Sequence, residues 1–146
     1  MLAFNKARAK SYPYNEVYLE APKKAINLPE GAPTKHQYVR LDSYVPNKEI
    51  VSRKYTQLSE VSEETAIRYL KELSDKYAPG TKIADVPSNI SGANAGIFKE
   101  NRGRTLRGQM ILEVPVQAKA VPKRVIDYAS LKGIKIRDTN NHIYNK

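Results

Sequence analysis

Two runs of alternating apolar and polar residues most constrain what this chain can fold into. They cover residues 38–42 and 49–57. Such alternation is typical of β-strands, because successive side chains of a strand point to opposite faces of the sheet. The segment between the runs contains Pro46 and Asn47, which favour a turn. The pattern therefore predicts a β-hairpin with one apolar and one polar face.

This hairpin would bring a carboxylate close to a lysine. If the polar faces of its two strands coincide, Asp42 lies near Lys54 across the ladder, where directly opposite side chains are roughly 5 Å apart. A carboxylate beside a lysine on paired strands is how many metal-dependent nucleases build their catalytic centre. A surface ion pair, worth about 0–1 kcal/mol, explains the same spacing. Spacing alone leaves both interpretations open.

The other periodic segments predict a single α/β domain of the α+β type. Its central mixed β-sheet should have about five to six strands and be flanked by two main helices. Besides the hairpin, further strands are expected over residues 14–19, 81–86, 109–117 and 134–138. Ser62 is the N-cap candidate of the longer helix, which should end at Pro79, and the shorter helix is expected over residues 122–131. Residues 1–13 are expected to form a basic N-terminal arm or tail. Residues 14–146 are expected to form the folded domain.

Residues 88–108 form the least regular part of this expected domain. Asparagine, serine and glycine are frequent in the first half, and four basic residues follow, namely Lys99, Arg102, Arg104 and Arg107. A long loop inside a compact domain is usually functional or disordered. A flexible basic loop that binds nucleic-acid phosphates and a solvated charged loop are the two interpretations. In the next strand, Pro115 cannot donate to a β-ladder, so that strand should lie at an edge or end there.

The charge of the chain favours a polyanionic partner. Lys and Arg number 25 against 15 Asp and Glu, so the net charge is +10. Such an excess attracts nucleic acid first, and anionic membranes or acidic proteins next. The chain has no cysteine, which excludes disulfides, thiolate catalysis and cysteine-based zinc sites. No run approaches the ~20 apolar residues that span a bilayer, so no membrane insertion is expected.

The order of the expected elements resembles a known nuclease superfamily. A strand, a strand with Asp42, a strand with Lys54, a helix and a further strand follow one another, as in the restriction-endonuclease-like core of the PD-(D/E)XK nucleases. The strings Tyr38-Val-Arg-Leu-Asp-Ser-Tyr and Glu49-Ile-Val-Ser-Arg-Lys-Tyr-Thr-Gln are also similar to C-terminal toxin domains of bacterial polymorphic toxins. These are the toxins of contact-dependent inhibition, Rhs and wall-associated proteins. The resemblance covers roughly residues 15–146.

The resemblance implies a nuclease toxin domain that hydrolyses phosphodiester bonds of RNA, with tRNA favoured, or of DNA. Such a domain would be secreted or delivered at the cell surface as the C-terminal part of a larger toxin, and would act in the cytoplasm of the target cell. Asp42 would hold a divalent cation, most simply Mg²⁺, and Lys54 would activate the attacking water. Arg40 and Arg53 would bind phosphate. A cognate immunity protein is implied, and an acidic one would complement the basic site.

One position departs from the superfamily pattern. The residue two positions before the lysine is usually Glu or Asp, and here it is Ser52. Three replacements remain open. Glu49 could be turned toward the site by a β-bulge, or Glu113 could reach it from a later strand. Alternatively no metal is used, and a phosphorane-like charge is stabilised by other side chains, namely Arg40, Arg53, Lys54 and Gln57.

Two other functions fit the same features. A non-enzymatic nucleic-acid-binding module would use the same charge, but it would tolerate the loss of Asp42 and Glu113, because removing acidic groups strengthens phosphate binding. A toxin domain of another activity, such as modification of NAD or of a protein, is the third possibility. The sequence contains no phosphate-binding glycine loop that would support it.

Overall fold

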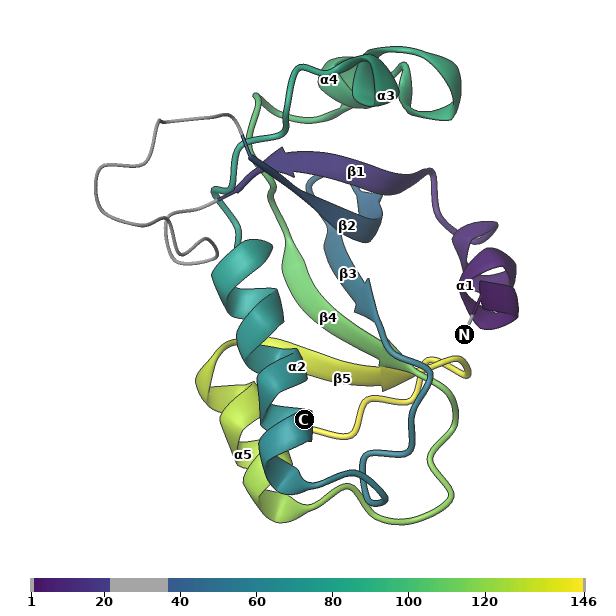
Figure 1. Cartoon of the computed structure of the whole chain (residues 1–146), viewed down its shortest axis with the longest axis vertical. Coiled ribbons are helices and arrows are strands. Elements are labelled where there is room, and N and C mark those ends of the chain that lie inside the picture. Colours follow the sequence, from purple (N-terminus) through teal and green to yellow (C-terminus); the bar gives the residue numbers. More distant parts are fainter. Residues whose placement is uncertain (1, 22–36, 146) are drawn as a thin grey trace.

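In the part of the chain that the structure describes, five strands lie side by side in their order along the chain (Figure 1). They are β1 (Tyr14–Glu20), β2 (Tyr38–Val45), β3 (Glu49–Arg53), β4 (Gln109–Val114) and β5 (Ile134–Asp138). Neighbouring strands are antiparallel from β1 to β3 and parallel from β3 to β5, so β2 alone runs against the other four. The computed structural model describes residues 2–21 and 37–145. It confirms the expected single α+β domain with a mixed sheet.

The predicted hairpin is present between β2 and β3. Its turn is tight, since the N–H of Lys48 donates to the carbonyl oxygen of Val45 over 2.9 Å. Asn47 has a φ of 67°, a left-handed conformation that asparagine adopts more readily than most residues. β2 continues to Val45, beyond the expected end at Asp42, and β3 stops at Arg53. Lys54 therefore lies just outside the ladder.

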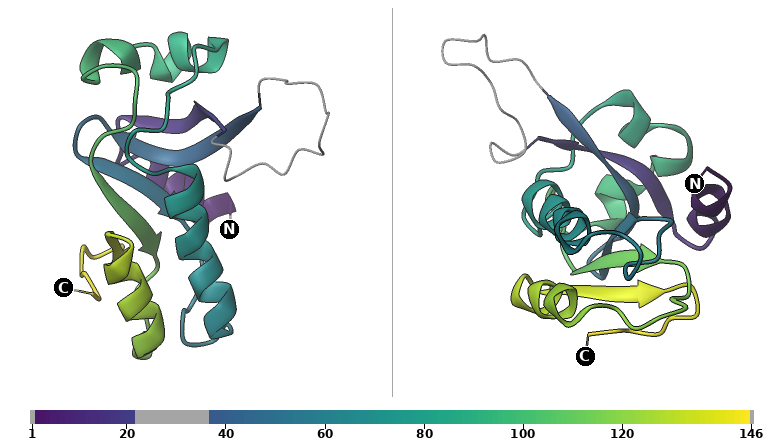
Figure 2. Two further views of the ribbon diagram at one scale, coloured as in Figure 1. Left: turned by 90° about the vertical axis from the view of Figure 1, so that its left-hand side faces the viewer. Right: turned by 60° about the horizontal axis from the view of Figure 1, so that its bottom comes forward.

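The two predicted main helices both cover one face of the sheet (Figure 2). They are α2 (Glu63–Lys76) and α5 (Lys123–Leu131). The N-cap assignment is confirmed, because the Ser62 side chain accepts the Thr65 N–H at 3.1 Å. Within the described residues, no helix combines the length and apolarity needed to cross a bilayer.

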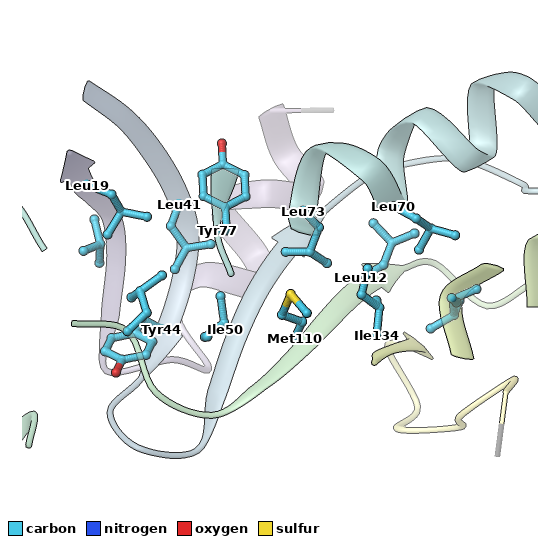
Figure 3. Close-up of a cluster of buried hydrophobic side chains, with 14 of the residues drawn as sticks. Leu19, Leu41, Tyr44, Ile50, Leu70, Leu73, Tyr77, Met110, Leu112 and Ile134 are labelled. Carbon is cyan, nitrogen blue, oxygen red and sulfur yellow. The ribbon is translucent and has the colours of Figure 1, made fainter. Parts of the chain in front are cut away.

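The main core lies between these helices and the sheet (Figure 3). From α2, Leu70 and Leu73 point toward Met110 and Leu112 of β4. Their spacing of three residues puts both leucines on one face of the helix. Leu70, Leu73 and Leu112 are fully buried. A fully buried leucine contributes about 1.5–3 kcal/mol by leaving water, so this interface accounts for much of the stability.

The opposite face of the sheet is partly covered by α1 (Leu2–Ala9), which forms in the segment expected to be an arm or tail (Figure 2). Asn5 of this helix accepts a hydrogen bond from Arg53 Nη1 over 2.9 Å. The N-terminal residues thus contribute side chains to the interior of the domain. Three prolines and a glycine predict an irregular connection over residues 21–33, and this segment lies outside the described residues apart from Ala21.

The structure corrects two expectations about residues 81–108. No strand forms over residues 81–86, where only isolated bridges join Leu19 to Ile83 and Lys82 to Thr105 within the described chain. The long loop expected over 88–108 is largely replaced by three short helical segments, namely α3 (Pro87–Ile90), η2 (Gly92–Asn94) and α4 (Ile97–Glu100). Two of the asparagines that favoured a loop, Asn89 and Asn94, are buried, and their side chains form hydrogen bonds with the backbone of β1.

Both edges of the sheet are covered by other parts of the chain. At β1, the side-chain amide of Asn89 accepts from the N–H of Tyr18 (3.2 Å) and donates to its carbonyl oxygen (2.8 Å). Asn94 makes the same pair of contacts with the backbone of Asn15. At β5, Asn145 accepts from the N–H of Ile136 (2.8 Å), and its amide donates to a neighbouring carbonyl. Amide side chains here take the place of a neighbouring strand.

β4 lies between β3 and β5 and is therefore not an edge strand. It ends at Val114, immediately before Pro115. Pro115 was expected either to place the strand at an edge or to end it, and it ends the strand. An interior strand needs its N–H groups for the ladders on both sides, and proline has none.

Candidate active site

The polar residues singled out in the sequence are divided between the two faces of the sheet. Alternation along β3 places Glu49 and Arg53 on the face covered by α1, and Ser52 on the face covered by α2. The parallel register pairs Arg53 with Glu113, so Glu113 shares their face. Lys54 follows the strand and contacts α2. The expected joining of Glu113 to the surface of Lys54 is therefore not observed.

A cluster of Asp42, Lys54 and Glu72, here called the lysine cluster, lies where β2 and β3 separate. The ladder between these strands ends at the pair Ser43–Val51. Beyond it, the Asp42 carboxylate accepts the backbone N–H of Arg53 over 2.7 Å, which fixes the carboxylate beside the end of β3. Lys54 Nζ lies 3.4 Å from Glu72 Oε1.

The pKa shifts in the lysine cluster reflect burial and neighbouring charges. Burial raises the pKa of Asp42, while the N–H of Arg53 and the charges of Arg53, Lys54 and Arg40 oppose this shift. Burial also raises the pKa of Tyr77, and the negative charges of Glu72 and Asp42 raise it further. Both carboxylates therefore lie near the same phenol. A buried carboxylate with a raised pKa accepts a proton more readily than an exposed one.

Glu72 was not identified from the sequence. It lies on α2, between Tyr69 and Lys76, at the border of the apolar stripe. Lys54 Nζ lies over the ring of Tyr69, 5.2 Å from the ring centroid. Lys76 Nζ lies 3.7 Å from Glu72 Oε2. A helix carboxylate at the border of a buried stripe was the available signal. Nothing in the sequence indicated which strand residue it would face.

A second cluster, here called the arginine network, lies on the opposite face, under α1. It comprises Arg8, Tyr12, Glu49, Arg53, Glu113 and Arg137. At its centre Arg53 Nε donates to Glu113 Oε1 over 2.6 Å, and both side chains are almost wholly buried, with 1% and 0% exposure. Tyr12 Oη donates to Glu113 Oε2 (2.6 Å), and Arg8 Nη2 donates to the same oxygen (3.2 Å). The carboxylate is thus enclosed by donors.

The arginine network continues to the start of β3. Arg137 Nη2 donates to Tyr12 Oη over 2.9 Å, and Arg137 also holds both carboxylate oxygens of Glu49, at 2.8 and 3.0 Å. Burial alone would raise the pKa of Glu113, but hydrogen bonds from Arg8, Tyr12 and Arg53 outweigh it and lower that pKa. Glu113 is therefore an anion whose charge is already compensated.

The three carboxylates expected to hold a metal do not come together. Glu113 is enclosed by the arginine network, Glu49 is held by Arg137, and Asp42 is held by the backbone N–H of Arg53. No group of three acidic or histidine side chains suited to a cation occurs within residues 2–21 and 37–145. That expected set does not fit a divalent cation. Asp42 and Glu72 are the carboxylates that share one neighbourhood.

The remaining predicted residues lie apart from the lysine cluster or at its margin. Arg40 is exposed and lies 3.8 Å from Glu16. The Gln57 amide is used structurally, since it donates to the carbonyl oxygen of Val116 and accepts the N–H of Ala118. Ser52 is buried.

The four basic residues expected to bind nucleic acid are exposed. They are Lys99, Arg102, Arg104 and Arg107. The N–H of Arg102 donates to Asn47 Oδ1 over 3.2 Å, which places this segment at the β2–β3 turn, at the other end of β3 from Lys54. Arg104 stacks on Phe98, with its guanidinium carbon 4.6 Å from the ring centroid.

Comparison with known proteins adds no relative to these observations. No family model, no curated protein and no solved structure matches the chain.

Proposed function

We propose that this chain is a nuclease that hydrolyses phosphodiester bonds, with its reactive groups in the lysine cluster. The observation that carries this proposal is the placement of Asp42 and Glu72 around Lys54 at the end of β3. Two carboxylates and one ammonium can together accept a proton and stabilise a phosphate oxyanion. The net charge of +10 supports a polyanionic substrate.

In the proposed reaction, Asp42 accepts a proton from a water molecule whose oxygen attacks phosphorus. The new P–O bond forms as the bond to the leaving oxygen breaks, and that oxygen takes up a proton from solvent water. The ammonium of Lys54 stabilises the negative charge that develops on the non-bridging oxygens. The exposed Arg40 would hold a neighbouring phosphate. Glu72 keeps the Lys54 side chain extended toward the reacting phosphate.

Within the described residues, Asp42 and Glu72 are one pair of possible ligands for the divalent cation that the sequence resemblance implies. Carboxylate oxygens of Asp42 and Glu72, together with substrate oxygens and water, are the kind of donors that Mg²⁺ prefers. A bound cation would supply Lewis-acid polarisation of the phosphate. Lys54 and Lys76 hold Glu72 at 3.4 and 3.7 Å, so a cation would have to compete with them.

The order of the elements supports the resemblance to PD-(D/E)XK nucleases. Asp42 lies on β2, Lys54 follows β3, and α2 comes next. The parallel strand that then joins the sheet is β4, not residues 81–86. The same resemblance is the basis for proposing RNA, with tRNA favoured, as the target, delivery as part of a larger toxin, and an acidic immunity protein. Binding of such a partner should weaken as salt rises.

The test is cleavage of total tRNA and of plasmid DNA by the purified chain, each with Mg²⁺ and with EDTA. Lys54→Met and Glu72→Gln are the test variants. Lys71→Met is the matched control, because Lys71 is an exposed lysine next to Glu72 on α2. We expect Lys54→Met to lose about 10²–10⁴-fold in rate, and the control to keep its activity. Cleavage by Lys54→Met at the wild-type rate would place the reaction elsewhere.

A non-enzymatic nucleic-acid-binding module is the second candidate. The exposed basic residues near the β2–β3 turn favour it, because they need no catalytic group to bind phosphates. Under this alternative neither nucleic acid is cleaved, and Asp42→Asn binds tRNA more tightly than the wild type. The nuclease proposal expects Asp42→Asn to lose cleavage.

A further inference from the structure

An open pocket of about 420 Å³ lies over the arginine network. Its walls include residues from α1 and its following turn, from the β2–β3 turn and from the end of β5, among them Arg8, Tyr12, Lys48, Glu49, Arg137 and Asn141. The volume is within the range of pockets that hold small ligands, roughly 300–1,000 Å³. Because it lies on the α1 face of the sheet, the pocket is separate from the lysine cluster.

Two buried donors at this pocket have no acceptor. The Nε atoms of Arg8 and Arg137 are buried, and neither has a hydrogen-bond partner in the part of the chain that the structure describes. Arg8 Nη2 donates to Glu113, and both Nη atoms of Arg137 are used by Glu49 and Tyr12. Buried polar groups are nearly always paired in native proteins. Arg8 and Arg137 line the pocket with hydrogen-bonding capacity that the described residues do not fully use, which favours a ligand that accepts hydrogen bonds.

The charges around the pocket favour an anion as that acceptor. Arg8, Arg137, Lys48 and the adjacent Arg53 bring four positive charges, while Glu49 and Glu113 compensate two of them. Lys48 forms no ion pair with any residue in the described ranges. The hydrogen bond from Arg137 to Glu49 raises the pKa of the guanidinium, so Arg137 stays charged. Within the part of the chain that the structure describes, two positive charges are thus left without a counterion.

We propose that this pocket binds a phosphate group. A phosphate offers several oxygens and negative charge, which suits guanidinium donors combined with a lysine. The site is held in place by its surroundings: a Cβ added to Gly108 would lie 2.5 Å from the Lys48 carbonyl carbon, so β4 fixes the backbone of the turn. The inference does not depend on the proposed nuclease activity, because it uses neither Lys54 nor Asp42.

The phosphate could belong to a free anion, to a mononucleotide or to a nucleic-acid chain. Titration calorimetry at constant ionic strength separates these sources with three probes: inorganic phosphate, adenosine 5′-monophosphate and a short RNA. The RNA titration uses the Lys54→Met variant, so that cleavage does not interfere. Comparable affinities for the first two probes would show that the pocket recognises the phosphate group alone. An affinity about tenfold or more higher for the mononucleotide or the RNA would show that the pocket also recognises the rest of that ligand.

Two charge-matched variants test the site. Lys48→Gln removes the lysine of the pocket, and Lys119→Gln removes an exposed lysine of the segment between β4 and α5. We expect phosphate binding to weaken about tenfold in Lys48→Gln, and to stay unchanged in Lys119→Gln. Amide resonances of Ser11, Tyr12 and Asn141 should shift during the titration.

Two results would overturn the proposal. One is the absence of saturable binding for all three probes, which would mean that the pocket holds only water. The other is equal weakening by Lys48→Gln and Lys119→Gln, which would mean that only the overall charge attracts the anion. Circular dichroism of each variant confirms that a lost signal does not come from unfolding.

Discussion

Glu113 and Arg53 face each other directly across the parallel β3–β4 pair, with Arg53 Nε 2.6 Å from Glu113 Oε1 and both side chains almost completely buried. Two charges removed from water are stable only when each is fully paired. Arg53 meets this requirement with three further contacts, to Asn5, to Ser43 and, through the backbone, to Asp42. The pair therefore links α1, β2, β3 and β4 around one salt bridge.

Glu113→Ala should destabilise the fold by about 3–5 kcal/mol, because it leaves the Arg53 guanidinium buried without a counterion. The double variant Arg53→Met/Glu113→Leu should lose less, since neither partner is then left as an unpaired charge. Urea denaturation of the single and double variants measures the coupling between the two sites. Additive losses would show that the pair does not act as a unit.

The stability of the protein should depend on pH through Glu113. Its pKa is lower in the folded chain than in the unfolded chain, where it is about 4.3. The ionised form then contributes stability above that unfolded value, and the contribution is lost as pH falls through the folded pKa. Denaturation at several pH values between neutral and about pH 3 should show a steeper acid loss for the wild type than for Glu113→Gln. Parallel curves would contradict this.

Asp42 should show the opposite dependence. Burial raises its pKa in the folded chain, so its contribution to stability is present below the unfolded pKa and is lost as pH rises through the folded one. At pH 7 the charged carboxylate opposes folding. Asp42→Asn keeps an acceptor for the Arg53 N–H, and should therefore raise the melting temperature at pH 7 while it abolishes cleavage. Thermal unfolding of both proteins at pH 7 measures this difference. A melting temperature lower for Asp42→Asn than for the wild type would contradict the expectation.

Deletion of residues 2–13 should destabilise the rest of the chain. It removes Asn5, Arg8 and Tyr12, which donate to or accept from Arg53 and Glu113. Leaving those buried groups without partners costs about 1–3 kcal/mol for each lost contact. Chemical denaturation of the shortened chain measures the effect. The control is Lys6→Gln/Lys10→Gln, which lowers the charge of the same segment at exposed positions.

The hairpin and both main helices could be predicted because their signals are local. The alternation around Asp42 and Lys54 and the leucine spacing of α2 are each contained in one segment. The segment after α2 was misjudged for the same reason. Residues 81–86 have strand-forming composition, but β4 occupies the place beside β3, so they form only isolated bridges.

The candidate site could be predicted only in part. The closeness of Asp42 and Lys54 follows from the hairpin, which is a local structure. Glu72 faces Lys54 only because α2 packs on a particular face of the sheet. The contact between Arg8 and Glu113 joins residues more than a hundred positions apart. Such pairs depend on tertiary packing, and a single sequence carries no periodic signal for them.

The covered edges of the sheet limit how another protein can recognise this one. Many partners bind by adding a strand to an exposed edge, where they pair with free backbone groups. Here Asn89 and Asn94 already occupy backbone groups of β1, and Asn145 occupies those of β5. A partner that used this mode would first have to displace those amides. Recognition through surface side chains, and through the electrostatic attraction of the excess positive charge, meets no such barrier.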